Sequence, residues 1–158
     1  ARAVAVAAMR YTDLSSERTK DYVFNYDRML AFEGDTGPYL LYALVRIRSI
    51  FRKATERSIA APADAPLAVA QPAEKSLALA LLRYPQAVRD AGTTLEPHRL
   101  CQYLSALAAA FSAFFDACPV LAAPDEPTRA SRLRLCRITE RVLADGLDVL
   151  GIPTLERM

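Results

Sequence analysis

The chain has 158 residues, of which 53% are hydrophobic, and a formal net charge of +2 at pH 7. Three cysteines without metal-binding spacing and a single histidine argue against a disulfide framework and a zinc site, so no metal site is expected. The sequence has no uninterrupted apolar run of about 18 residues and no signal-peptide pattern, so we expect a cytoplasmic protein without a membrane partner.

Only five glycines and several long segments of 3.6-residue periodicity predict an all-α fold. The length suits one domain with part of another, and residues 1–33 look like the separate part. Residues 1–11 favour a helix, followed by a polar connection at residues 13–20. Residues 21–27 alternate like a short strand or an extended segment, and residues 28–32 favour a short helix.

A long helix is predicted over residues 38–58, after a Gly-rich turn in which Asp35 or Thr36 can cap it. Its apolar stripe consists of Leu40, Leu44, Ile47, Phe51 and Ala54. Between residues 44 and 58 there are five basic residues against one acidic residue, so positive charge is concentrated in the second half of this helix.

A second face of the same helix carries Tyr39, Tyr42 and Arg46, about 110° away from the apolar stripe. Aromatic rings and Arg planes stack unpaired RNA bases, while basic groups hold phosphates. The alternative is that both tyrosines pack against a neighbouring helix with their hydroxyls at the rim, and Arg46 is an ordinary solvated charge. The pattern alone leaves both interpretations open.

Four prolines predict a variable loop at residues 60–73, since proline interrupts any helix interior. Residues 74–83 resume a helical pattern that Tyr84 and Pro85 kink or end, with a further turn or two at residues 85–91.

The next long helix is expected to open at Glu96-Pro97 and to stop at Pro119. Its apolar stripe consists of Leu100, Leu104, Leu107, Phe111, Phe114 and Cys118. A last helix is predicted over residues 128–150. Its inward residues are Leu135, Ile138, Val142 and Val149, and its outward ones are Arg129, Arg132, Arg134, Arg137 and Arg141. Together these helices predict a helical bundle.

Three stretches closely resemble arginyl-tRNA synthetases, a family of class I aminoacyl-tRNA synthetases. Residues 11–54 resemble the end of the catalytic domain and the first helix of the anticodon domain. Residues 94–121 and 132–158 resemble the rest of that domain, including the Glu-Arg-Met ending. The resemblance implies that an end-piece of the catalytic α/β domain (residues 1–33) precedes an all-α anticodon-binding domain of the DALR type (residues 34–158).

The resemblance also implies a partner and an activity. The family joins L-arginine to tRNA(Arg) with ATP and Mg²⁺ in protein biosynthesis. Its catalytic signatures, a His-Ile-Gly-His-like motif and a Lys-Met-Ser-Lys-like loop, are absent from this sequence. We therefore expect no catalytic residue and no cofactor in this chain, which by itself should be an inactive, monomeric tRNA-binding part. The competing hypothesis is a non-catalytic helical module that binds a protein or serves as a scaffold.

By the same resemblance, Tyr39, Tyr42, Arg46 and Phe115 occupy positions that meet the anticodon loop, and Met158 matches a terminal Met beside it. Residues 31–36 match a loop that joins the two domains and is thought to shift when tRNA binds. Four further arginines are candidate phosphate contacts: Arg48, Arg52, Arg134 and Arg137.

Overall fold

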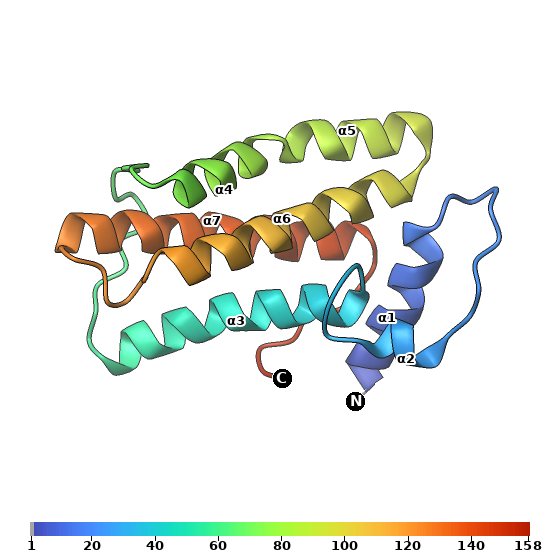
Figure 1. The fold of residues 1–158 in the computed structure, drawn as a ribbon, viewed down its shortest axis with the longest axis horizontal. Coiled ribbons are helices and arrows are strands. Elements are labelled where there is room, and N and C mark those ends of the chain that lie inside the picture. The colour runs from blue at the N-terminus through green and yellow to red at the C-terminus, as the bar shows by residue number, and fades with distance from the viewer. Residues whose placement is uncertain (1) are drawn as a thin grey trace.

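The computed structural model describes residues 2–158, and seven helices account for the regular structure there. They are α1 (Arg2–Ser15), α2 (Tyr26–Leu30), α3 (Gly37–Glu56), α4 (Pro72–Leu82), α5 (Tyr84–Thr94), α6 (Pro97–Ala117) and α7 (Glu126–Val149). In Figure 1, α3, α6 and α7 run along the long axis, α4 and α5 cover one side of them, and α1 and α2 lie at one end. The predicted all-α bundle is confirmed, with no strand in the described part of the chain.

Helix α3 begins as the turn chemistry predicts. The Thr36 hydroxyl, not Asp35, caps it by accepting a hydrogen bond from the Tyr39 N–H at 3.1 Å, and proline occupies the first turn. Four of the five predicted stripe residues are buried, while Phe51 is half-buried at the edge of the core. The predicted loop before α4 is present, although its last two predicted residues, 72–73, already belong to α4.

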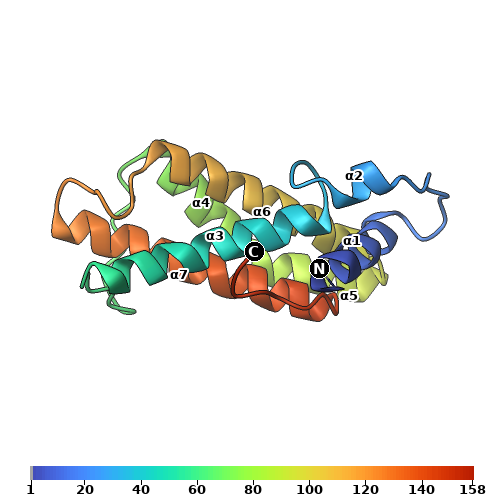
Figure 2. The ribbon, with the colours of Figure 1, turned by 90° about the horizontal axis from the view of Figure 1, so that it is seen from below.

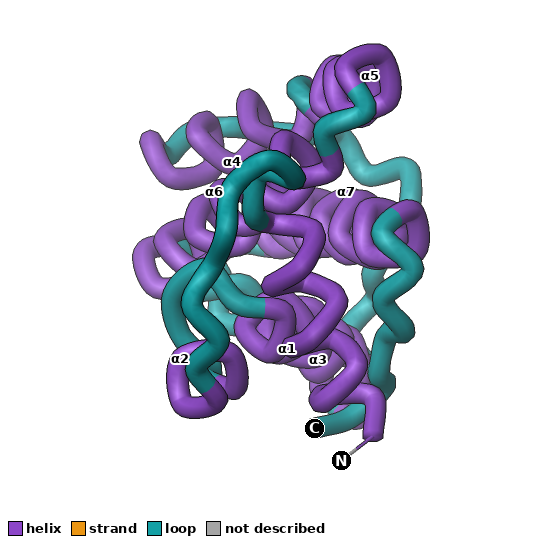
Figure 3. The backbone as a smooth tube through the Cα atoms, turned by 90° about the vertical axis from the view of Figure 1, so that its right-hand side faces the viewer, coloured by secondary structure: helices purple, strands orange, loops and turns teal. Residues whose placement is uncertain are grey.

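Helix α6 is the central helix of the bundle, and all six of its predicted stripe residues are buried. Among the described residues it alone has the length and apolar composition of a membrane-spanning helix. In the fold it packs against α1, α3, α4, α5 and α7, as Figure 3 shows along the bundle. Its apolar character is therefore accounted for by the core.

The inward face of α7 differs from the prediction. Leu135 is buried, and Ile138 and Val142 are partly buried against the core, but Val149 is 59% exposed. Leu147 is fully buried instead, and Val149 lies two residues further on, about 200° round the helix.

Arg132 contradicts the prediction that the arginines of α7 point outward. Its side chain is buried and donates to the Glu74 carboxylate of α4 at 2.7 Å and to the Pro119 carbonyl at 2.9 Å. Glu74 also accepts hydrogen bonds from the Ala70 and Gln71 N–H groups, at 2.8 and 2.9 Å. A carboxylate on a different helix and a loop carbonyl therefore satisfy a charge that the pattern of α7 alone assigns to solvent.

The N-terminal segment is more helical than predicted. Helix α1 continues through part of the expected polar connection, to Ser15, while Ala1 lies outside the described residues. Residues 21–25 are extended without strand pairing, and α2 begins at Tyr26, where the Asn25 side chain accepts from the Arg28 N–H. Helix α5 has 11 residues, against the one or two turns expected.

Helix α1 shares its core with the bundle. Ala7 and Tyr11 are buried in the same cluster as residues of α3 and α6. Where α1 crosses the start of α3, a Cβ atom on Gly37 would overlap the Ala7 carbonyl, so only glycine permits this approach. The helix predicted to be the edge of another unit therefore packs closely on the bundle.

Candidate nucleic-acid interface

The three residues of the second face of α3 differ in their exposure. Tyr39 is half-buried between α3 and α6, with its hydroxyl oxygen 3.4 Å from the Ser112 hydroxyl oxygen. Tyr42 is 44% exposed, so its ring is available to a partner. Tyr39 thus satisfies the packing interpretation with its hydroxyl at the rim, whereas Tyr42 does not.

Arg46 connects this face to α6. Its guanidinium carbon lies 4.1 Å from the centre of the Phe115 ring, which is a cation–π arrangement. One guanidinium nitrogen also lies 3.4 Å from the Asp116 carboxylate, whose side chain is 71% exposed. The structure therefore brings Tyr39, Arg46 and Phe115 to one surface, with Tyr42 beside them on α3.

Sequence reasoning missed Ser112 and Asp116, which modify this surface. Ser112 orients the Tyr39 hydroxyl, and Asp116 partly neutralises Arg46. No pattern within α6 identifies them, because their partners are about seventy positions away along the chain. We refer below to Tyr39, Tyr42, Arg46 and Phe115 as the aromatic–arginine surface.

The C-terminal segment lies against α3 from the side opposite Arg46. Arg48, about 200° round the helix from Arg46, donates to the Leu155 carbonyl at 2.9 Å, and Arg52 donates to the Glu156 carbonyl at 2.9 Å. Figure 2 shows this segment crossing α3, with the C-terminus in front of the helix. Met158 is 48% exposed there.

The four candidate phosphate contacts already have partners within the protein. Besides the carbonyl contacts of Arg48 and Arg52 given above, Arg48 is paired with the carboxylates of Glu140 and Glu156. Arg134 donates to the backbone carbonyl of Ala65 in the Pro-rich loop, and the Arg137 guanidinium lies 4.5 Å from the centre of the Phe51 ring. A phosphate would have to compete with these contacts.

The loop at residues 31–36 is fixed from two sides. The Thr36 hydroxyl donates to the Ala31 carbonyl at 2.6 Å, which closes the loop. The buried Tyr11 hydroxyl of α1 donates to the Asp35 carboxylate, and lies 3.1 Å from the Cys101 carbonyl of α6. Burial, followed by the nearby Asp35 carboxylate, raises the pKa of Tyr11, so its hydroxyl remains a donor.

Comparison with known families identifies the class of domain. A profile described as "DALR anticodon binding domain" matches residues 40–158, which is most of the chain. The chain belongs to this family.

Known relatives agree with this assignment. Over 158 residues the chain is 53% identical to an arginine–tRNA ligase of Frankia casuarinae, covering 100% of this chain and 26% of that protein. An arginine–tRNA ligase of Haemophilus influenzae is 48% identical over 156 residues, covering 99% of this chain and 27% of the relative. This chain therefore spans about a quarter of the length of these relatives.

Solved structures give the same result. The arginyl-tRNA synthetase of Thermus thermophilus superposes with a TM-score of 0.88 at 44% identity, and that of Plasmodium falciparum with 0.86 at 33% identity. Each covers 99% of this chain, which matches 27% of the solved chain. Nothing in these comparisons supports the alternative of a protein-interaction or scaffold module.

Proposed function

We propose that this chain is the anticodon-binding portion of an arginine–tRNA ligase and that its aromatic–arginine surface contacts the anticodon loop of tRNA(Arg). The observation that carries the proposal is the meeting of Arg46 and Phe115, from two helices, beside the exposed ring of Tyr42. Family membership supplies the ligand class.

The chemistry of this surface suits single-stranded RNA. The exposed Tyr42 ring offers a platform on which an unpaired base stacks, a contact worth about 1–3 kcal/mol per base. Phe115 holds the Arg46 guanidinium in place from below, and the ion pair with the exposed Asp116 is weak enough to exchange for a phosphate. Met158 approaches from the other side of α3 and would contact the loop there.

Arginine activation with ATP and Mg²⁺ belongs, in this proposal, to a catalytic part that residues 2–158 do not contain. No group of three or more His, Cys, Asp or Glu side chains within that range could hold a metal ion. Residues 1–33 would be the tail of the catalytic part and its connection to the anticodon domain at residues 34–158. The whole enzyme would be a cytoplasmic monomer.

The loop at residues 31–36 would then lie between the two domains. It contacts α1 through Tyr11 and α3 through the Thr36 cap, so it is linked to one helix of each domain. We propose that a change in this loop accompanies tRNA binding, and a coupling measurement between the sites would establish it.

Fluorescence anisotropy with labelled tRNA(Arg), at low and moderate salt, tests the proposal. We expect salt-dependent binding that weakens when the anticodon is substituted, and that weakens by about 1–3 kcal/mol in Tyr42→Ala. Tyr26→Ala is the matched control, because this tyrosine is 70% exposed and belongs to α2, not to the aromatic–arginine surface. Binding that ignores both the anticodon and Tyr42 would leave only a basic surface and refute the proposal.

A further inference from the structure

The segment after α7 is held in place although it contains no helix or strand. Its residues, 151–158, are here called the tail. Three arginine side chains donate to three of its backbone carbonyls: Arg10 to Gly151, Arg48 to Leu155 and Arg52 to Glu156. These arginines come from two helices, α1 and α3, so the tail is attached at both its start and its end.

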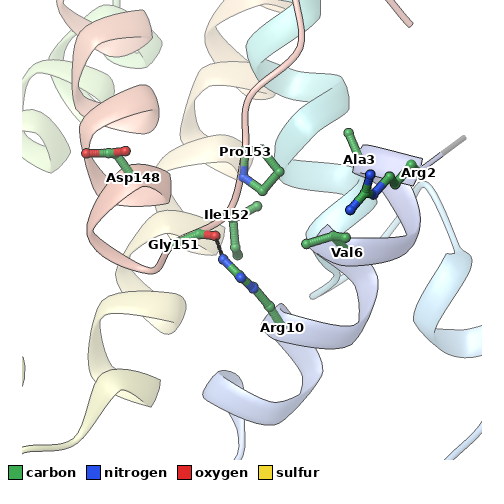
Figure 4. A pocket seen from close by; sticks show the side chains of 8 residues that line it. All are labelled: Arg2, Ala3, Val6, Arg10, Asp148, Gly151, Ile152 and Pro153. Carbon is green, nitrogen blue, oxygen red and sulfur yellow. Dashed lines mark hydrogen bonds between the residues drawn. The ribbon is translucent and has the colours of Figure 1, made fainter.

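The attachment at the start depends on a glycine. Figure 4 shows Arg10 reaching from α1 to the Gly151 carbonyl, and Ile152 and Pro153 line the same pocket between α1 and the tail. Gly151 has a φ of +67°, and a Cβ atom there would lie 2.8 Å from a guanidinium nitrogen of Arg10. The positive φ calls for glycine, whereas the close contact is with the end of a flexible side chain that can shift.

The attachment at the end depends on Arg48. Its side chain is 15% exposed and faces three acceptors: Glu140 at 3.0 Å, the Leu155 carbonyl at 2.9 Å and Glu156 at 2.8 Å. Glu140 belongs to α7 and Glu156 to the tail, so a single guanidinium joins α3, α7 and the tail. A planar guanidinium with several fixed donors suits this role.

We infer that Arg48 is a positioning residue, which holds the tail across α3 and contributes to RNA binding through the tail rather than by binding phosphate. This inference rests on the proposed function. Glu140, whose side chain is 23% exposed, already pairs with Arg48, and Glu156, which is 80% exposed, adds a weaker partner, so a phosphate gains little from Arg48. Without Arg48, Glu140 and Glu156 would lose their shared counter-ion, and Arg52 would be the remaining arginine that attaches the end of the tail.

The position of the tail can be measured without RNA. The chain has three methionines, so a sample labelled at the methionine methyl groups gives three NMR signals. In Arg48→Ala we expect the Met158 signal to move toward its random-coil position and to sharpen, while those of Met9 and Met29 stay unchanged. Arg141→Ala, which removes the same charge from an exposed position on α7, should leave all three signals in place.

Binding of tRNA(Arg) then separates the two roles of Arg48. The Arg48→Ala change is made in the full chain and in a chain shortened by residues 154–158. A positioning role predicts that Arg48→Ala weakens binding in the full chain to the level of the shortened chain. In the shortened chain, Arg48→Ala should then weaken tRNA binding at most about twofold more than Arg141→Ala does.

The outcomes are distinct. A direct phosphate contact would weaken binding by the same factor in both chains and lower the salt dependence by about 0.7 in log–log slope, and this would overturn the inference. An unchanged Met158 signal in Arg48→Ala would overturn it as well. If the unmodified chain shows no preference for tRNA(Arg), the proposed function fails, while the methyl signals still decide whether Arg48 holds the tail.

Discussion

The ion pair between Glu74 and Arg132 makes a quantitative prediction about stability. Glu74 is 1% exposed and Arg132 is 6% exposed, and they join α4 to α7 at 2.7 Å. Replacing Glu74 with Gln keeps the shape of the side chain but leaves the guanidinium charge buried without its counter-ion. Removal of one partner of a buried pair costs about 3–5 kcal/mol.

The lower end of that range applies here. The Gln amide oxygen can still accept from a backbone N–H at the start of α4, and Arg132 keeps its bond to the Pro119 carbonyl. We therefore expect Glu74→Gln to lower the free energy of unfolding by about 3 kcal/mol. For a protein of this size that corresponds to a decrease in Tm of about 6–12 °C.

Urea unfolding followed by circular dichroism measures this change directly. Glu56→Gln, at the exposed end of α3, is the control and should change the free energy of unfolding by less than about 0.5 kcal/mol. The double variant Glu74→Met, Arg132→Met should lose less stability than the sum of the two single variants, because the residues interact directly. A loss below about 1 kcal/mol in Glu74→Gln would refute the reasoning that the buried charges depend on each other.

Three further predictions concern pH, a glycine and the cysteines. Burial alone raises the pKa of Glu74, but hydrogen bonds from the Gln71 N–H and from Arg132 outweigh it and hold the pKa below its usual value. Its contribution should therefore be present in full above about pH 4.5 and disappear as the pH falls through the lowered pKa, which urea titrations at several pH values will measure. Gly37→Ala should lower Tm, measured by thermal unfolding, because the new methyl group overlaps the carbonyl of α1. Burial raises the pKa of Cys101 and of Cys136 to about 12, so neither should react with iodoacetamide at pH 8 until the protein is unfolded, as mass spectrometry will show.

The parts of the fold that could be predicted are those determined by the residues of a single helix. The stripe of α6 repeats at helical spacing, and every residue in it is buried. The cap at Thr36 follows from a local preference for a hydroxyl before the first turn. Burial that depends on a second helix could not be predicted, and Arg132 is buried because its partner is 58 positions away in the sequence.

The candidate site divides in the same way. The row of Tyr39, Tyr42 and Arg46 follows from the geometry of a single helix. Phe115 entered only through resemblance to a family, and nothing in α6 alone indicates that its ring would lie under Arg46. The attachment of the tail depends on arginines from α1 and α3, and therefore on tertiary packing that no local pattern encodes.

The arginines show that a candidate RNA contact should be judged by the partners that the arginine already has, and not by how many arginines lie nearby. Arg132 is buried against a carboxylate and serves stability. Arg48 is shared between two carboxylates and a carbonyl, so its donors are committed to α7 and to the tail. Arg46 has one ionic partner, at 3.4 Å, and that carboxylate is largely exposed. Because a guanidinium that is partly exposed and only weakly paired exchanges its partner at little cost, Arg46 is the arginine of these three from which we expect direct contact with RNA.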